Sequence, residues 1–267
     1  MTSKSPVALI TGAGSGIGRA LAQEAAGAGY DLVLVGRRLA PLEETATLIG
    51  VGTPRLISAD ITSVEGRARI VAAVGDRLDI LVNNAGSLSV GRLTDLSDDD
   101  LSQTITTNLT AALLLTRDLV PALTLAQGRI VNIGSMFGII AFPYFAAYSA
   151  TKFAMRGLSD ALRRELAEFG ISVTYVAPRA TRTPAESRFS HLVAPFDMAL
   201  DDPDRVAQRA WAGIMAGRNT IYPGFGERIF AVVQAIAPSL IDAALIKKTR
   251  TTQTQAALMT LSKQEEA

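Results

Sequence analysis

The sequence contains no cysteine and a single histidine, His191. Without cysteine there can be no disulfide, thiol nucleophile or thiolate metal site, and one histidine excludes a centre built from several histidines. No metal site is therefore expected. With 26 Lys and Arg against 25 Asp and Glu, the chain has almost no net charge, and it contains no basic run. A nucleic-acid partner is therefore not expected.

Long apolar runs are also missing from the sequence. No stretch approaches the ~20 unbroken apolar residues of a membrane-spanning helix. The start, Met1-Thr-Ser-Lys-Ser-Pro, lacks the apolar region of a signal peptide. A soluble, cytoplasmic protein is the resulting expectation. No internal repeat, low-complexity linker or break in composition divides residues 1–267, which predicts a single domain.

Short apolar runs alternate with helical patterns along the chain. The runs predict strands at about 7–11, 31–36, 55–59, 78–83, 129–134, 172–177 and 219–222. Continuously apolar strands suit a parallel sheet that is covered on both faces, and strand-helix alternation favours right-handed crossovers. The pattern therefore predicts a doubly wound α/β domain with about seven parallel strands and helices on both faces.

A glycine-rich turn, Thr11-Gly-Ala-Gly-Ser-Gly-Ile-Gly18, follows the first predicted strand and precedes a helix beginning near Gly16. In that setting glycines permit tight curvature and let a pyrophosphate approach the N–H groups of the helix terminus. The spacing differs by one register from the usual G-x-G-x-x-G fingerprint. The turn predicts a dinucleotide site, and a purely structural strand-to-helix turn is the alternative.

Tyr148 and Lys152 lie four residues apart at the start of a helix that is predicted to run to about residue 168, so their side chains share one face. A neighbouring ammonium favours the phenolate and would lower the pKa of Tyr148 from its usual value near ~10. A phenol adjusted in this way can act as a general acid. The alternative is a half-buried tyrosine beside a solvated lysine.

Several motifs in consistent order make the chain resemble the short-chain dehydrogenase/reductase family from about Val7 to Thr183. The glycine-rich turn resembles its cofactor loop, Asp60-Ile61 its adenine-contacting pair, and Asn83-Asn-Ala-Gly86 the segment that ends its fourth strand. Four residues match its catalytic positions: Asn108, Ser135, Tyr148 and Lys152. The resemblance implies a Rossmann fold and an NAD(P) site formed by Gly12, Ser15, Gly16, Ile17, Gly18, Arg37, Arg38, Asp60, Ile61, Asn84, Ala85, Gly86, Tyr148, Lys152, Pro178 and Thr183.

The same resemblance implies a mechanism. Ser135 would polarise a substrate carbonyl while Tyr148 delivers a proton to its oxygen, and hydride would come from the nicotinamide. Lys152 would lower the pKa of Tyr148 and bond the nicotinamide ribose, and Asn108 would anchor a water that links Lys152 to solvent. The same groups working in reverse would oxidise an alcohol. A homodimer or homotetramer is also implied.

The end of the second predicted strand, Leu34-Val-Gly-Arg-Arg38, bears on cofactor choice. NAD enzymes of this fold usually carry an acidic side chain here for the ribose hydroxyl, whereas a phosphate on the ribose requires cations. Gly36 removes the acid, and Arg37 can pair with a phosphate through two hydrogen bonds. NADP is therefore expected, with NAD or dual use as the alternative.

Arg179 replaces the glycine that commonly follows Pro178 in the family, which affects the expected backbone path because a glycine adopts positive φ at low cost. Thr183 has the offset of the family's nicotinamide-contacting threonine, and Thr181 could substitute for it. Arg179 could favour an anionic group at the substrate mouth or simply face outward.

Three further regions bear on substrate and partners. Residues 179–202, with Pro184 and Pro195, form a candidate substrate lid, and the apolar segment 138–145 favours a hydrophobic ketone or alcohol or else packs internally. Residues 226–248 form an apolar helical segment, split by Pro238, that could pack on the core, a subunit, the pocket or a membrane surface. Residues 250–267 are predicted to be polar and frayed.

Parts of the sequence are also compatible with other functions. An epimerase or dehydratase acting on a nucleotide sugar would use a similar Tyr and Lys but usually needs a larger C-terminal substrate domain. A serine hydrolase would place Ser135 in a Gly-x-Ser-x-Gly elbow, which is absent, and His191 lies in the lid as an expected surface residue. A catalytically idle NAD(P)-binding redox sensor or scaffold would use the same fold. Because such a sensor does not need Ser135, Tyr148 and Lys152 together, the sequence favours an enzyme.

Overall fold

The computed structural model of the protein describes residues 5–265, so residues 1–4 and 266–267 of the predicted domain and tail lie outside the described part. Its centre is one seven-stranded parallel sheet with the strand order β3-β2-β1-β4-β5-β6-β7. The prediction of a doubly wound parallel α/β fold is confirmed. The strands are β1 (Val7–Thr11), β2 (Asp31–Gly36), β3 (Arg55–Ser58), β4 (Ile80–Asn83), β5 (Arg129–Ile133), β6 (Ser172–Val176) and β7 (Thr220–Ile221).

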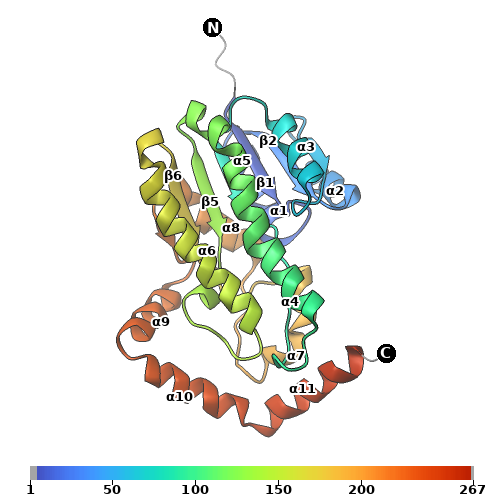
Figure 1. Cartoon of the computed structure of the whole chain (residues 1–267), viewed down its shortest axis with the longest axis vertical. Helices are drawn as coiled ribbons and strands as arrows, with labels where there is room; N and C mark the ends of the chain where they lie inside the picture. The colour runs from blue at the N-terminus through green and yellow to red at the C-terminus, as the bar shows by residue number, and fades with distance from the viewer. Residues whose placement is uncertain (1–4, 266–267) are drawn as a thin grey trace.

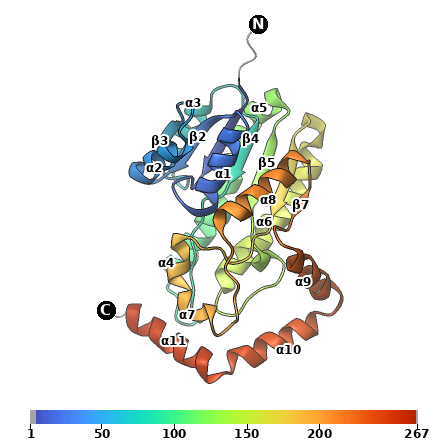
Figure 2. The ribbon, with the colours of Figure 1, turned by 180° about the vertical axis from the view of Figure 1, so that it is seen from behind.

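Helices cover both faces of this sheet (Figures 1 and 2). One face packs against α1 (Gly16–Gly27), α2 (Leu39–Ile49) and α8 (Pro203–Met215), and the other against α3 (Val64–Val74), α5 (Ala111–Ala126) and α6 (Ala146–Glu165). The central strands are buried on both sides, which explains why their sequences are continuously apolar rather than alternating.

A long helical stretch precedes β5. It comprises α4 (Asp98–Ile105), a π-helical turn at Thr106–Thr110 and α5, and Ser97 begins it with a capping box. By length and composition, Asp98–Ala126 is apolar enough to cross a membrane, but its apolar side packs on the sheet through α5. The apolar character of this helix is explained by its packing in the core.

The candidate lid, residues 179–202, contains a single turn of 3-10 helix at Pro184–Arg188 and the short α7 (Ser190–Val193). Its apolar side chains Phe189, Leu192 and Phe196 are buried in a cluster with Leu88 and Phe145. The lid is therefore anchored by its phenylalanines over the carboxyl ends of the strands.

The C-terminal part forms three helices that run along the end of the molecule, beyond α7 (Figures 1 and 2). They are α9 (Phe225–Ile236), α10 (Pro238–Thr249) and α11 (Thr252–Glu265). The predicted split at Pro238 is confirmed: the proline opens α10, and the chain bends by 109° between the two helices. Large apolar side chains stay exposed on this part, at Ile229, Phe230, Val232, Ile236, Leu240 and Ile246.

The tail predicted to be frayed, 250–267, contains the helix α11 over residues 252–265 in its described part. Leu258 is buried in the same cluster as Phe189 and Leu192 of the lid. The Thr254 hydroxyl, also buried, donates a hydrogen bond of 2.8 Å to the Lys248 carbonyl. The polar composition concealed these few anchoring contacts.

Candidate active site

The glycine-rich turn joins β1 to α1 at the carboxyl edge of the sheet. Gly12 and Gly16 adopt φ values of +65° and +53°, which glycine takes without strain. A Cβ on Gly18 would lie 2.3 Å from the Gly12 carbonyl oxygen, and one on Gly16 would lie 2.8 Å from the Thr183 methyl group. Each glycine is thus required either by its backbone angle or by a close approach.

Hydrogen bonds from Thr11 and Asn84 hold this turn against the end of β4. The Thr11 hydroxyl donates to the Val82 carbonyl at 3.2 Å and accepts from the N–H groups of Asn84 and Ala85 at 3.0 Å. The Asn84 side-chain amide donates to the Thr11 carbonyl at 2.9 Å. The glycine-rich turn and the segment Asn83–Gly86, two motifs assigned from the sequence to one cofactor site, are therefore joined by hydrogen bonds.

Two adjoining cavities open at this edge, of about 390 Å³ and about 630 Å³. The smaller one joins the glycine turn to Ser135, Tyr148 and Lys152, while the larger one extends toward Arg38, Asp60 and Ile61. Of the predicted cofactor residues, only Gly18 lines neither cavity, since it shapes the turn from behind. The smaller cavity is lined by Gly12, Ser15, Gly16, Ile17, Arg37, Asn84, Ala85, Gly86, Pro178 and Thr183 among others.

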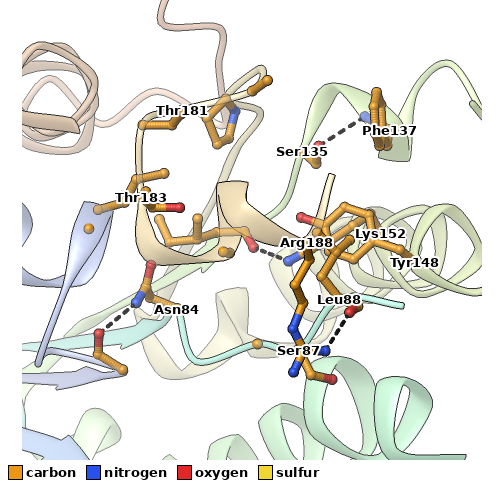
Figure 3. A pocket seen from close by; sticks show the side chains of 18 of the residues that line it. Asn84, Ser87, Leu88, Ser135, Phe137, Tyr148, Lys152, Thr181, Thr183 and Arg188 are labelled. Atoms are coloured by element: carbon orange, nitrogen blue, oxygen red, sulfur yellow. Dashed lines mark hydrogen bonds between the residues drawn. The ribbon is translucent and has the colours of Figure 1, made fainter. Parts of the chain in front are cut away.

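Ser135, Tyr148 and Lys152 come together from β5 and α6 on one side of the smaller cavity (Figure 3). Ser135 follows β5, and its Oγ accepts a hydrogen bond of 3.1 Å from the Phe137 N–H. The Lys152 ammonium lies 5.3 Å from the centre of the Tyr148 ring and donates to the Ile133 carbonyl at 2.9 Å. These three side chains share one reaction space.

The pKa values at this site depart from the sequence expectation. Burial raises the pKa of Tyr148 to about 12, and a hydrogen bond with Ser135 acts in the opposite direction. Burial also lowers the pKa of Lys152 to about 8. The expected lowering of the Tyr148 pKa by Lys152 is thus not found in the protein alone, because the enclosed site disfavours the charged form of both groups.

Asn108 lies in the π-helical turn and lines neither cavity. Its side-chain oxygen accepts from the Ser87 N–H at 2.7 Å, and its amide donates to the Ser87 carbonyl at 2.9 Å and to the Thr151 hydroxyl at 3.2 Å. It ties the segment after β4 to α6. Its side chain is therefore occupied by protein partners, which is typical of a residue that holds a site in shape.

The larger cavity carries the candidate cofactor-selecting residues. Arg37 and Arg38 are both exposed there, directly after β2. The Asp60 carboxylate accepts from the Thr62 N–H at 2.9 Å and hydroxyl at 2.8 Å. The bond from the Thr62 N–H, aided by the nearby charge of Arg37, lowers the pKa of Asp60. Arg37 itself makes no ion pair among the described residues.

Arg179, which replaces the family's glycine, lies outside the positive-φ region, so the chain follows an ordinary path there. Its guanidinium pairs with both carboxylate oxygens of Asp201, at 2.8 and 2.7 Å. The Thr181 hydroxyl donates to the Arg179 carbonyl at 2.9 Å. Thr183 packs on Gly16 instead, so of the two threonines Thr183 is the one placed against the glycine turn.

Several residues at the site were not singled out from the sequence. Leu88 and Phe137 form part of its apolar wall, and Tyr175 lies beneath it. The Tyr175 hydroxyl donates to the Ser135 carbonyl at 3.1 Å and accepts from the Ser135 N–H at 3.3 Å, which fixes the loop that carries Ser135. Leu88 could have been identified as a site residue because it follows the end of β4 closely, whereas no local sequence pattern in β6 marks Tyr175 as part of the site.

The hydrolase alternative has no geometric support. His191 does not line the cavity that contains Ser135. It is half-buried rather than on the surface as expected, its Nε2 has no hydrogen-bond partner, and burial lowers its pKa. Within residues 5–265, no group of three His, Asp or Glu side chains is arranged to hold a metal ion.

Comparisons with known proteins agree with this geometry. A family model described as short chain dehydrogenase matches residues 6–192. A putative ketoacyl reductase of granaticin polyketide synthase from Streptomyces violaceoruber is 36% identical over 79% of this chain and 82% of its own. Trans-4-hydroxycyclohexanecarboxylate dehydrogenase from Sinomonas cyclohexanicum is 36% identical over 67% of this chain and 73% of its own. A short-chain dehydrogenase from Sphingobium yanoikuyae, solved with NADPH, superposes with a TM-score of 0.76 at 31% identity over 89% and 96%.

Proposed function

Because the chain belongs to the short-chain dehydrogenase/reductase family, whose members are NAD(P)-dependent oxidoreductases of alcohols and ketones, we propose that it uses NADP(H) to interconvert a hydrophobic ketone or aldehyde and its alcohol. One observation carries the proposal: a single cavity joins the glycine turn to Ser135, Tyr148 and Lys152. A merely nucleotide-binding sensor does not need that connection.

The residues present fit a dinucleotide. Gly12, Ser15 and Gly16 line the smaller cavity at the N-terminus of α1, where free N–H groups attract a pyrophosphate. The larger cavity then leads to Asp60 and Ile61, which would hold the adenosine. Pro178 and Thr183 would border the nicotinamide at the other end of the same path.

We assign the preference for NADP(H) to Arg37, supported by Arg38. Both are exposed in the larger cavity, and Gly36 offers no carboxylate to a ribose hydroxyl. A guanidinium can hold a phosphate through two charge-assisted hydrogen bonds. The NADPH that accompanies the Sphingobium yanoikuyae structure agrees with this assignment. NAD use remains the alternative outcome of the test below.

When bound, the nicotinamide supplies the hydride chemistry at the carbonyl carbon. In the proposed mechanism Ser135 donates a hydrogen bond to the carbonyl oxygen, and Tyr148 transfers its phenolic proton to that oxygen. A phenol with a pKa of about 12 keeps its proton at neutral pH, which suits the acid that a reduction requires. Lys152 would bond the ribose, and Asn108 would hold the segment after β4 against α6 so that the site keeps its shape.

The substrate end of the cavity supports an apolar ketone. Its wall contains Leu88, Phe137, Phe145, Phe189 and Met198. Apolar walls with a few directed polar groups are typical of sites for hydrophobic small molecules. The two curated relatives are named for a ketoacyl reduction and for the dehydrogenation of a hydroxylated cyclohexane ring, which agrees with a ketone or secondary alcohol.

The test is fluorescence titration of the purified protein with NADPH and with NADH, for the wild type and for Arg37→Ala. We expect NADPH to bind more tightly and Arg37→Ala to remove most of the difference, about tenfold to a hundredfold for a charge-assisted pair. Arg69→Ala, an exposed arginine on α3 outside both cavities, is the matched control. Equal affinities in the wild type would refute the NADP preference, and failure of both nucleotides to bind would refute the enzyme assignment.

A further inference from the structure

The smaller cavity has an unbalanced charge. Among the described residues that line it there is no Asp or Glu, but there are four cations: Arg37, Lys152, Arg179 and Arg188. Nucleotide phosphates account for positive charge near the glycine turn. They do not by themselves account for positive charge at the apolar end of the cavity.

Three of the four cations already have a role or a partner. Arg37 also lines the larger cavity and lies at its adenosine end. Arg179 is neutralised by its paired contact with Asp201. Lys152 donates to the Ile133 carbonyl beside Tyr148. Arg188 is the cation of this cavity that the proposed function leaves unused.

Arg188 ends the 3-10 turn of the lid and extends into the cavity (Figure 3). Its Nη1 donates a hydrogen bond of 2.9 Å to the Leu88 carbonyl, and no carboxylate within residues 5–265 forms an ion pair with it. That single bond leaves most of its five N–H donors without a protein acceptor.

The position of Arg188 places this charge at the substrate end. Leu88, to which it is bonded, is buried in the apolar cluster with Phe145 and with Phe189, the residue after Arg188. In Figure 3 the Arg188 side chain runs toward Leu88 and Ser87, with Asn84 on one side and Tyr148 and Lys152 on the other. Arg188 is exposed, and its guanidinium lies where the polar residues Ser87 and Asn84 meet the apolar wall of the cavity.

We propose that Arg188 binds a carboxylate of the substrate, so that the enzyme acts on ketones or alcohols that combine an apolar body with a carboxylate. The inference rests on the proposed function and names the substrate class of the same site. A guanidinium matches a carboxylate through two parallel, charge-assisted hydrogen bonds. Binding energy gained there would orient the ketone against Ser135 and Tyr148.

The experiment compares ketones that differ only in charge. The holoenzyme, with saturating NADPH, is offered para-acetylbenzoate, meta-acetylbenzoate and levulinate, each beside its uncharged primary amide. For the wild type we expect kcat/KM for at least one acid to exceed that of its amide by about tenfold to a hundredfold, the value of a hydrogen-bonded charge pair. Arg188→Gln should bring that ratio close to one, and Arg188→Lys should restore part of it.

Arg182→Gln is the matched control, since Arg182 is an exposed arginine of the same segment that does not line the cavity, and it should keep the wild-type ratio. The proposal would be overturned if the ketone were reduced as well in the amides as in the acids. It would also be overturned if the acids were neither reduced nor inhibitors of the amides' ketone reduction, or if Arg188→Gln bound NADPH more weakly. The last outcome would assign Arg188 to the nucleotide. If the wild type failed to bind NADPH, or if Tyr148→Phe still reduced the ketone of the amides, the proposed function itself would be refuted.

Discussion

The two ends of the site are built in different ways. At the glycine turn, the shape of the cavity is set by backbone, with positive φ at Gly12 and Gly16 and a close approach at Gly18. At the substrate end, it is set by side chains such as Phe137 and Phe189, which come from segments far apart in the sequence. The first end suits a ligand that many proteins share, and the second suits one that differs between them.

This contrast says which changes each end should tolerate. A backbone site fails when a single atom is added at a position such as Gly18, because the main-chain carbonyl of Gly12 lies in the way and cannot move aside cheaply. A side-chain site changes its preference when a residue is exchanged, while the fold persists. Substitutions at the two ends should therefore separate nucleotide binding from the reaction and from substrate choice.

The largest expected effect is at the reaction centre. Tyr148→Phe removes the proton donor, so kcat/KM should fall by about a hundredfold to ten-thousandfold, the usual contribution of a positioned general acid. The affinity for NADPH should change by much less. Tyr144→Phe, a neighbouring tyrosine that does not line the cavity, is the control. Steady-state kinetics measures kcat/KM, and titration measures the affinity for NADPH. If both fell by the same factor, the separation of the two ends would be contradicted.

A second substitution tests the backbone end. In Gly18→Ala the added methyl group would lie 2.3 Å from the Gly12 carbonyl oxygen, so the turn must open and NADPH affinity should fall by roughly a hundredfold. Gly27→Ala, at the other end of α1, meets no atom within 4 Å and should bind NADPH as the wild type does. If Gly18→Ala retained full affinity, the turn would not be the rigid element described above.

The smallest effect is expected where the two ends meet, at Lys152. Its pKa falls from the usual 10.5 to about 8 on burial. Between these values the unfolded chain binds more protons than the folded one, so the free energy of unfolding rises with pH. From about pH 8 to about pH 9.5 the gain from this group is about 1.5 kcal/mol.

Urea denaturation of the protein without nucleotide measures this slope. Lys152→Met, which cannot titrate, should lack the gain, so the difference between the two curves isolates the lysine. Tyr148, with a pKa raised to about 12 in the folded protein, opposes this slope slightly at the upper end of the range, because the unfolded chain begins to lose the phenolic proton there. Both proteins carry this tyrosine, so its contribution is largely removed when the two curves are subtracted. Parallel stability curves for the wild type and Lys152→Met would show that folding does not lower the pKa of Lys152.

The same contrast explains what the sequence could predict. The strands and the nucleotide residues are marked by local signals: apolar runs for β1 to β7, and the spacing of Gly12, Gly16 and Gly18 for the turn. Tyr148 and Lys152 are also found from a short spacing. Each of these signals spans only a few neighbouring residues, so it can be recognised without knowledge of tertiary contacts.

What the sequence could not predict depends on long-range packing. Tyr175 supports Ser135 from β6, forty positions further along the chain. The direction of the Tyr148 pKa shift follows from how deeply the fold encloses the site, which spacing does not reveal. The helix at 252–265 was missed because its contacts with the lid involve only a few residues, such as Leu258, in a polar stretch.

The packing of Leu258 on the lid also has a consequence for the order in which the molecule matures. A chain is synthesised from its N-terminus at roughly 5–20 residues per second, and its parts fold as they emerge. The glycine turn and the strands that flank it leave the ribosome first, whereas Leu258 is among the last residues to join the apolar cluster beside the substrate. The packing of the lid is therefore completed only after the glycine turn and its strands have been synthesised.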